Sequence, residues 1–246
     1  MMILPNKKDA IHKVWLYRIL TGIYDNAFLA SVLYFKGGTA AAMRGLLDRF
    51  SVDLDFDFVG KDEQLKQTRT ELEKIFSDLG LEIADASKKV PQYFLKYPNT
   101  PQERSTLKVD VTTTKILANT YEPVQLAEIN RIVYCQSIET MFANKLVATI
   151  ERFEKGGSIA GRDIYDIHHF FLQGFSYSSP VIVERRGTTV HKFFEVLTTF
   201  VDKHITETVI NQDINMLLTP DHFQKLRKIL KNETMQFLKD EVERTN

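Results

Sequence analysis

Three aspartates alternate with apolar residues in the segment SVDLDFDFV, residues 51–59. Because successive side chains of a strand point to opposite faces, we expect Asp53, Asp55 and Asp57 to share one face. Carboxylates crowded on one face repel one another unless a cation lies among them. Hard divalent cations such as Mg²⁺ or Mn²⁺ bind carboxylate oxygens, phosphate oxygens and water. The D-x-D pair of Asp53 and Asp55, with carboxylates about 7 Å apart, therefore predicts a metal site, and a solvated edge strand is the alternative.

Two glycines, Gly37 and Gly38, lie upstream of the D-x-D segment. They stand between a strand-like run that ends at Lys36 and a set of helix-forming residues that follows Thr39. Such a turn lets backbone N–H groups approach a phosphate closely. A Gly-Gly pair by itself predicts only a turn. Followed closely by a D-x-D strand, it predicts a site in which one element binds phosphates and the next binds their metal.

A third acidic candidate is Asp110, in the segment LKVDVTT. Polar and apolar residues alternate here, so Asp110 points to a different face from the valines beside it. In a nucleotide site this carboxylate would complete the metal site or accept the proton of an attacking hydroxyl. A surface aspartate is the alternative. We expect Asp53, Asp55 and Asp110 to converge on one pocket, with the paired glycines at its rim.

Further along the chain, charged side chains fall on apolar helix faces. At about 100° per residue, Lys145 lies in the middle of the apolar arc of a predicted helix at 138–154. An ammonium group buried without a partner is costly, so Lys145 either reaches solvent or binds an anion. Asp163 lies inside the apolar arc of the next predicted helix, and Asp166 lies at its edge. The pattern predicts that Lys145 and Asp163 meet at a shared polar site.

Hydrophobic periodicity predicts an α/β (or α+β) fold in two parts. We expect a domain at 1–130 that contains a mixed sheet with flanking helices, and a helical bundle at 131–246 that contributes to the active-site cleft. Strands are predicted at 31–36, 51–59, 81–85, 92–97, 106–113 and 129–134. Helices are predicted at 8–24, 62–80, 138–154, 162–172, 189–203 and 221–243, with one more that Thr39 caps.

The composition excludes several classes of protein. Among 246 residues, 32 are basic and 32 acidic, so no global field attracts nucleic acid or membrane, and a polyanion would need local basic patches. The single cysteine, Cys135, excludes a disulfide framework and a Cys-rich zinc site. No apolar run approaches the roughly 18 residues that span a bilayer, and the N-terminal charges follow too short an apolar stretch for a signal peptide. We expect a cytoplasmic protein with no membrane partner.

The stretch KGGTAAAMRGLLDRFSVDLDF resembles the first motif of the polymerase-β-like nucleotidyltransferase superfamily, in which a Gly-Gly or Gly-Ser turn precedes a D-x-D. More narrowly, the GGT turn followed by Arg49, Ser51, Asp53 and Asp55 resembles the AbiEii/AbiGii toxin family, which includes the MenT toxins. The resemblance runs from about residue 28 to about residue 175. In the helical half, the positions that match the family are Lys145, Ala148, Arg162, Asp163 and Asp166.

This resemblance implies a nucleotidyltransferase core in residues 1–130 that transfers a nucleoside monophosphate from a nucleoside triphosphate to an acceptor, the 3′ end of tRNA. It also implies a toxin with a separately encoded antitoxin as its partner. The residues expected to bind the nucleotide are Gly37, Gly38, Thr39, Arg49, Ser51, Lys145 and Asp166. The residues expected to be catalytic are Asp53, Asp55, Asp110, Lys145 and Asp163, of which the first three would hold Mg²⁺ or Mn²⁺.

Two other functions stay open. One keeps the site but changes the acceptor to a protein or a small molecule such as an aminoglycoside. The other is a catalytically silent module that binds nucleotide or antitoxin. Asp57 lies outside the motif and is only a candidate outer group, and the Gly-rich segment 155–161 predicts a helix–helix connection rather than a second phosphate loop. Basic side chains that permit RNA binding are Lys225, Arg227, Lys228 and Lys231, with Arg185 and Arg186 in a predicted loop.

Overall fold

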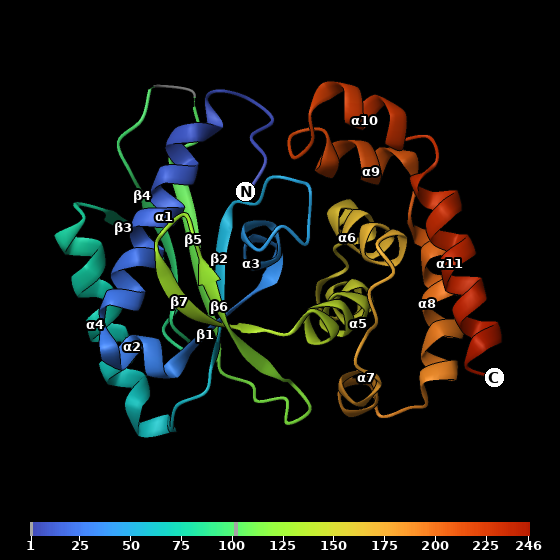
Figure 1. Ribbon diagram of the computed structural model, residues 1–246, viewed down its shortest axis with the longest axis horizontal. Coiled ribbons are helices and arrows are strands. Elements are labelled where there is room, and N and C mark those ends of the chain that lie inside the picture. Colours follow the sequence, from blue (N-terminus) through green and yellow to red (C-terminus); the bar gives the residue numbers. More distant parts are fainter. Residues whose placement is uncertain (1, 101–102) are drawn as a thin grey trace. The chain divides into compact units, whose positions relative to one another are not determined.

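The computed structural model describes residues 2–100 and 103–246, which form two compact units. The first, here called the sheet unit, comprises the described residues up to Lys115 together with Tyr121–Gln136. The second, the helical unit, comprises Ile116–Thr120 and Ser137–Asn246. The predicted fold class, a mixed sheet with flanking helices followed by a set of helices, is confirmed (Figure 1).

The sheet unit is built on a seven-stranded mixed sheet in the order β3-β4-β5-β2-β1-β7-β6. The strands are β1 (Leu33–Lys36), β2 (Asp53–Phe58), β3 (Glu82–Ala86), β4 (Gln92–Lys96), β5 (Thr106–Thr112), β6 (Tyr121–Leu126) and β7 (Arg131–Gln136). β2 is parallel to β5, and β1 is parallel to β7, whereas all other neighbours are antiparallel. The D-x-D strand β2 therefore lies in the middle of the sheet, and the edge-strand alternative is wrong.

Helices cover both faces of this sheet. They are α1 (Asp9–Asp25), α2 (Ala27–Val32), α3 (Gly37–Met43), the 3-10 turn η1 (Asp62–Gln64) and α4 (Leu65–Asp78). Figure 1 shows α1, α2 and α4 against one face and α3 beside the other. Leu54 and Phe56 of β2 are fully buried, and the Phe56 ring packs against Phe35 of β1 at 5.3 Å between centroids. Burial of these alternate side chains leaves the aspartates of β2 on the α3 side.

The sheet unit departs from the predicted elements in two places. The strand predicted at 31–36 starts only at Leu33, because the Asn26 side chain accepts hydrogen bonds from the backbone N–H groups of Phe28 and Leu29 and starts the short helix α2. The edge strand β6 was not predicted. Its Pro123 and its polar residues hide the pattern, and a proline is tolerated there because one side of an edge strand makes no ladder hydrogen bonds.

The helical unit contains α5 (Ile138–Gly156), α6 (Gly161–Leu172), α7 (Ser179–Arg186), α8 (Val190–His204), α9 (Glu207–Ile214), α10 (Pro220–Leu226) and α11 (Leu230–Arg244). Three helices predicted from the periodicity are confirmed as α5, α6 and α8. The single helix predicted at 221–243 is wrong, since the chain forms α10 and α11 instead. The short helices α7 and α9 bury two side chains each, too few for a recognisable apolar stripe. No helix among the described residues is long and apolar enough to cross a membrane.

Candidate active site

The carboxylates predicted for the sheet unit lie on neighbouring strands. In the parallel pair of β2 and β5, Asp55 is opposite Asp110, and Asp53 is opposite Lys108. Directly opposed residues of paired strands point to the same face, so Asp53, Asp55 and Asp110 share one face of the sheet, here called the carboxylate face. The hydrogen-bond register, which the sequence does not reveal, is what brings Asp110 beside the D-x-D pair.

The glycine turn begins beside Asp55. Lys36, the last residue of β1, is opposite Asp55 in the antiparallel pair of β1 and β2, and Gly37 follows at once. A β-carbon added to Gly37 would lie 2.5 Å from Asp55 Oδ2, closer than real β-carbons come to any atom. Its φ of 78° is also a conformation that favours glycine. The position therefore requires glycine both for its backbone angle and for its approach to the carboxylate.

Gly38 is equally close to two other predicted residues. A β-carbon there would lie 2.6 Å from the Nη2 atom of Arg49 and 3.1 Å from Ser51 Oγ. Arg49 is almost fully buried, and its Nη1 donates to the backbone carbonyl of Phe50 at 2.9 Å. The glycine pair thus brings its own backbone against a carboxylate on one side and a guanidinium on the other.

Thr39 has a different position from the one predicted. The sequence predicts a helix cap at Thr39, but α3 begins at Gly37, so Thr39 lies inside the first turn. Its buried hydroxyl is hydrogen-bonded to Ser51 Oγ, at 2.8 Å, and to the backbone carbonyl of Asp53. Thr39 and Ser51 therefore hold the glycine turn against the start of β2, and the predicted helix cap is wrong.

The electrostatics of the carboxylate face favour a bound cation. Burial, followed by the charges of Asp53 and Asp110, raises the pKa of Asp55 to about 6, while Lys36 and Lys108 act in the opposite direction. A carboxylate whose ionised form is disfavoured by its neighbours gains from any cation that lies among them. Oxygen ligands with this much negative charge fit a divalent metal such as Mg²⁺.

The three predicted ligands do not form a finished metal site by themselves. Within the described residues, no group of three or more His, Cys, Asp or Glu side chains is placed so that it could hold a metal ion. Asp110 Oδ2 instead forms an ion pair with Lys108 and accepts a hydrogen bond from Gln92 Nε2 at 3.1 Å. This arrangement suits an ion that takes two protein carboxylates and completes its shell with phosphate oxygens and water.

The contacts of Asp57 indicate a role in holding the sheet together. It is buried, and its carboxylate accepts hydrogen bonds from Lys36 Nζ at 2.6 Å, from Gln136 Nε2 at 2.6 Å and from the Tyr121 hydroxyl at 2.9 Å. Because β1, β6 and β7 each supply one of these donors, Asp57 ties the strands on that side of β2 together. Lys36 and Lys108 are the charged residues here that sequence reasoning missed. The sequence feature that could have identified them is their position, since Lys36 directly precedes Gly37 and Lys108 lies two residues before Asp110.

The helical unit contains the second predicted polar cluster. Lys145 Nζ on α5 lies 3.0 Å from Asp163 Oδ1 and 2.9 Å from Asp166 Oδ2, both on α6. Both carboxylates are buried, and Arg152 Nη2 lies 3.3 Å from Asp163 Oδ2. The predicted meeting of Lys145 and Asp163 is confirmed. Two carboxylates and two cations leave the cluster balanced in formal charge.

The Gly-rich segment and the paired arginines have structural roles in the helical unit. Gly157, with φ of 66°, caps the C-terminus of α5, and a β-carbon on Gly161 would lie 2.6 Å from the backbone carbonyl oxygen of Val209. These contacts support the predicted helix–helix connection. Arg185 and Arg186 lie in α7 rather than in a loop, and they pair with Glu151 at 2.8 Å and Glu154 at 2.7 Å, respectively.

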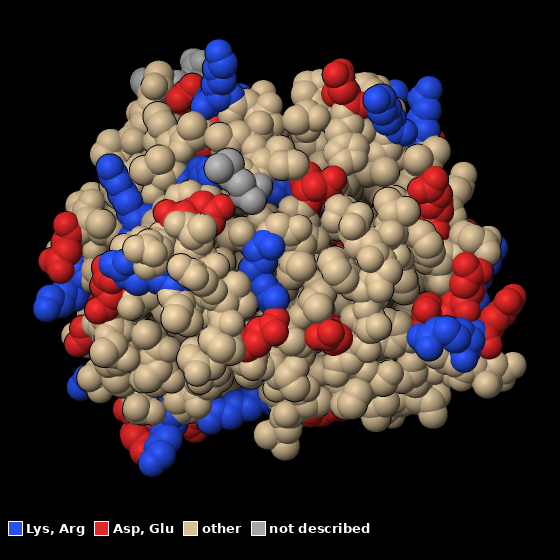
Figure 2. All heavy atoms as spheres, in the orientation of Figure 1, with Lys and Arg blue, Asp and Glu red and all other residues tan. Residues whose placement is uncertain are grey.

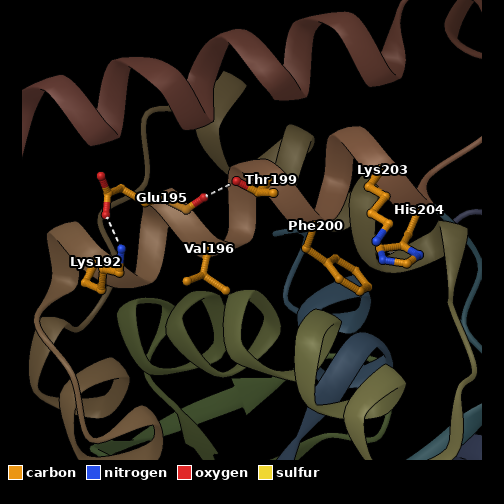
Figure 3. Close-up of a pocket in the computed structure, with 7 residues that line it drawn as sticks. All are labelled: Lys192, Glu195, Val196, Thr199, Phe200, Lys203 and His204. Carbon is orange, nitrogen blue, oxygen red and sulfur yellow. Dashed lines mark hydrogen bonds and ion pairs between the residues drawn. The ribbon is translucent and has the colours of Figure 1, made fainter.

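A surface hollow of about 480 Å³ runs along α8. Figure 3 shows Lys192, paired with Glu195, at one end, and Lys203 with His204 at the other. The residues that line it are Lys192, Glu195, Val196, Thr199, Phe200, Lys203 and His204. No residue of the site predicted from the sequence is among these seven.

Comparison with known proteins identifies relatives of the chain. A family model described as "Nucleotidyl transferase AbiEii toxin, Type IV TA system" matches residues 18–241. The crystal structure of JHP933 from Helicobacter pylori is similar, with a TM-score of 0.55 and 18% identity over 98% of this chain and 96% of that one. So is MenT4, a nucleotidyltransferase toxin from Mycobacterium tuberculosis H37Rv, with a TM-score of 0.58 and 16% identity over 95% and 84%. No curated protein matches the chain. At these identities the solved structures show a shared fold.

Proposed function

The chain belongs to the AbiEii family of nucleotidyltransferase toxins from type IV toxin–antitoxin systems, and on this premise we propose that it transfers a nucleoside monophosphate from a nucleoside triphosphate to the 3′ end of tRNA. The family implies an antitoxin partner, which we propose is separately encoded. The proposed acceptor places its action in the cytoplasm.

The apposition of Gly37 and Asp55 is the main structural support for this proposal. Backbone that comes this close to a carboxylate leaves no room for a side chain, but it leaves the turn open to a phosphate chain, and a metal ion held by Asp55 would supply positive charge beside those phosphates. Arg49, beside Gly38, supplies a fixed positive charge to the same turn.

Asp53 and Asp55 are the proposed ligands of a Mg²⁺ or Mn²⁺ ion. Such an ion, when bound, neutralises phosphate charge and stabilises the leaving pyrophosphate. The raised pKa of Asp55, about 6, supports this assignment, because a divalent cation would restore the ionised carboxylate. The positive charges of Lys36 and Lys108 partly offset the repulsion among the carboxylates of this face.

Asp110 is the proposed proton acceptor. In the transfer, the acceptor hydroxyl oxygen forms a bond to the α-phosphorus, the bond from this phosphorus to the β-phosphate oxygen breaks, and pyrophosphate leaves. The hydroxyl proton passes to Asp110, at Oδ1, since Lys108 and Gln92 already bind Oδ2. Lys108 and Gln92 thereby hold this carboxylate in one orientation on the carboxylate face.

The part of Lys145, Asp163 and Asp166 in the reaction stays a prediction. Their ion-pair cluster fixes the ammonium group of Lys145 between two buried carboxylates. We propose that Lys145 stabilises the triphosphate as a compact cation and that the two aspartates orient it. The predicted contribution of residues 131–246 to the active-site cleft is part of the same proposal.

The proposal of tRNA follows from the resemblance to the MenT toxins rather than from a basic surface. Figure 2 shows acidic and basic side chains interspersed over the face in view. Arg185 and Arg186 are paired with glutamates, so they are weaker candidates for phosphate contacts than their sequence suggested. On α10 and just beyond it, Lys225 and Lys228 are exposed. Local groups would therefore have to recognise the RNA.

Labelling tests the proposed acceptor. The protein is incubated with Mg²⁺, with each nucleoside triphosphate labelled at the α-phosphate, and with tRNA, total protein or an aminoglycoside. We expect label on tRNA that is removed by trimming its 3′ end, and no label with the Asp55→Asn variant. Label confined to protein or to the aminoglycoside would contradict the tRNA acceptor. An absence of transfer to any of these, with nucleotide still bound, would favour a silent binding module.

A further inference from the structure

An aromatic ring lies exposed on the carboxylate face. Phe94 of β4 is 37% exposed, whereas its neighbours Tyr93 and Leu95, which point to the other face, are fully buried. Phe94 shares its face with Gln92, whose side chain reaches Asp110 of β5. An exposed ring on the inner part of a sheet is costly in water and is available to stack with a flat ligand.

The register places this ring in line with the proposed site. Phe94 is opposite Lys108 in the pair of β4 and β5, and Lys108 is opposite Asp53 in the pair of β5 and β2. Lys108 Nζ lies 6.0 Å from the centroid of the Phe94 ring and also binds Asp110. Two strand spacings, about 10 Å, thus separate Phe94 from Asp53 across the face.

The order of the strands assigns a side to each reactant. The Gly37 turn follows β1, on one side of β2, while Phe94 lies beyond β5, on the other side. In an in-line displacement, the attacking and leaving oxygens lie on opposite sides of the transferred phosphorus. If the pyrophosphate leaves towards the glycine turn, the attacking hydroxyl approaches from the side of Asp110 and Phe94.

We propose that Phe94 stacks against the terminal nucleobase of an RNA acceptor and so positions its 3′-hydroxyl beside Asp110. This inference rests on the proposed function and adds to it a residue that positions the acceptor. Every nucleobase has a flat face that stacks on an aromatic ring, so the contact recognises a base of any identity. Lys108, next to the ring, adds a cation near the RNA backbone.

Base-deleted RNA provides the most direct test. Binding of a short single-stranded RNA is compared with binding of the same RNA that lacks its 3′-terminal base, in wild type, Phe94→Leu and Phe94→Trp. Removal of one stacked base is expected to weaken binding by wild type and by Phe94→Trp about five- to hundredfold, and to have no effect on Phe94→Leu. Tyr134→Leu is the matched control and should respond to base deletion as wild type does. Tyr134, at 43%, is about as exposed as Phe94, but it lies on β7, which β1 and β2 separate from β5 and β4.

The added tryptophan reports the contact itself. The chain contains one tryptophan, Trp15, which is buried against Tyr97, so the additional fluorescence of Phe94→Trp can be assigned to the new side chain. We expect the intact RNA to quench this additional fluorescence and the base-deleted RNA not to quench it. The inference would be overturned if deletion of the base weakened RNA binding equally in Phe94→Leu and in wild type. It would also be overturned if Phe94→Leu lost affinity for nucleoside triphosphate in the absence of RNA. These measurements of binding do not require nucleotidyl transfer. If the protein transferred no label to RNA but gave the expected binding and fluorescence results, the proposed function would be contradicted and the base contact would still be supported.

Discussion

Gly37 and Asp55 lie so close together that a β-carbon on the glycine would stand 2.5 Å from the carboxylate oxygen Oδ2. One residue belongs to the turn that we propose binds phosphates, and the other to the strand that we propose binds a metal. Their contact joins these two halves of the proposed chemistry. It also makes the turn unusually sensitive to a single methyl group.

Gly37→Ala should therefore abolish nucleotidyl transfer, with a loss of about hundredfold or more, because the methyl group displaces Asp55 and strains the turn. Gly45→Ala is the control. Gly45 has a similar φ, 74°, but a β-carbon there would meet no atom within 4 Å, so this variant carries only the backbone strain of about 1–2 kcal/mol. Equal activity of the two variants in single-turnover transfer would show that the contact with Asp55 does not matter.

Asp55→Asn should stabilise the fold while it removes activity. The unfolded chain ionises this group near pH 3.8 and the folded protein near pH 6, so the folded state holds the proton longer and loses stability as the pH rises through this window. The cost at neutral pH is about 3 kcal/mol. Urea unfolding should find the variant more stable than wild type at about pH 7 and no different below about pH 4. The control Asp78→Asn, an exposed position at the end of α4, should show neither effect.

Divalent metal should reverse the difference in stability between Asp55→Asn and wild type at neutral pH. Mg²⁺ or Mn²⁺ binds only the folded wild type in the proposed scheme, so it should raise the melting temperature of wild type and leave that of Asp55→Asn unchanged. An equal rise in both proteins would place the metal elsewhere on the chain.

His12 gives the opposite pH dependence. Burial between Val52 and Tyr97 lowers the pKa of His12 to about 4, although its hydrogen bond to the Val52 carbonyl acts in the other direction. Between about pH 4 and pH 6.5 the unfolded chain binds this proton and the folded protein does not, so about 3 kcal/mol of stability is lost on acidification through that window. Because the Asp55 effect is common to both proteins, the difference between wild type and His12→Gln isolates the histidine. A difference that does not change with pH would contradict the assignment.

Lys145→Met should be among the most destabilising single changes in the helical unit. It leaves Asp163 and Asp166 buried with less positive charge, at a cost of about 3–5 kcal/mol. Lys155→Met, on the same helix, removes an exposed partner of Glu151 and should cost less than about 1 kcal/mol. Adding Asp163→Asn and Asp166→Asn to the first variant should recover much of the loss. If denaturant unfolding finds the two lysine variants alike, the buried cluster does not stabilise the helical unit.

The sequence predicted local features of the site better than its assembly. The D-x-D alternation assigned Asp53 and Asp55 to one face because a strand has a period of two residues, and periodicity likewise directed Lys145 towards Asp163. By contrast, the pairing of Asp110 with Asp55 and the ion pair of Lys108 depend on which strands are neighbours. No local pattern encodes that neighbourhood.

Failures of prediction have the same origin. Thr39 looks like a helix cap by residue type, yet its hydroxyl is hydrogen-bonded to Ser51 and to the Asp53 carbonyl on another element. Arg185 and Arg186 look like an RNA-binding pair, yet glutamates on α5 are bonded to both. Side chains that serve tertiary contacts resemble functional ones until their partners are known. The proposed domain boundary near residue 130 stays a prediction for limited proteolysis to test.

The most direct measurement follows the label of a nucleoside triphosphate, placed on the α- or the γ-phosphate, in the presence of tRNA and Mg²⁺. For wild type we predict that the α-label appears on tRNA and the γ-label appears only in pyrophosphate, with transfer reduced at least about hundredfold in Asp53→Asn and in Asp55→Asn. Transfer of the γ-label to tRNA, or α-label transfer that survives both substitutions, would contradict nucleotidyl transfer at the carboxylate face.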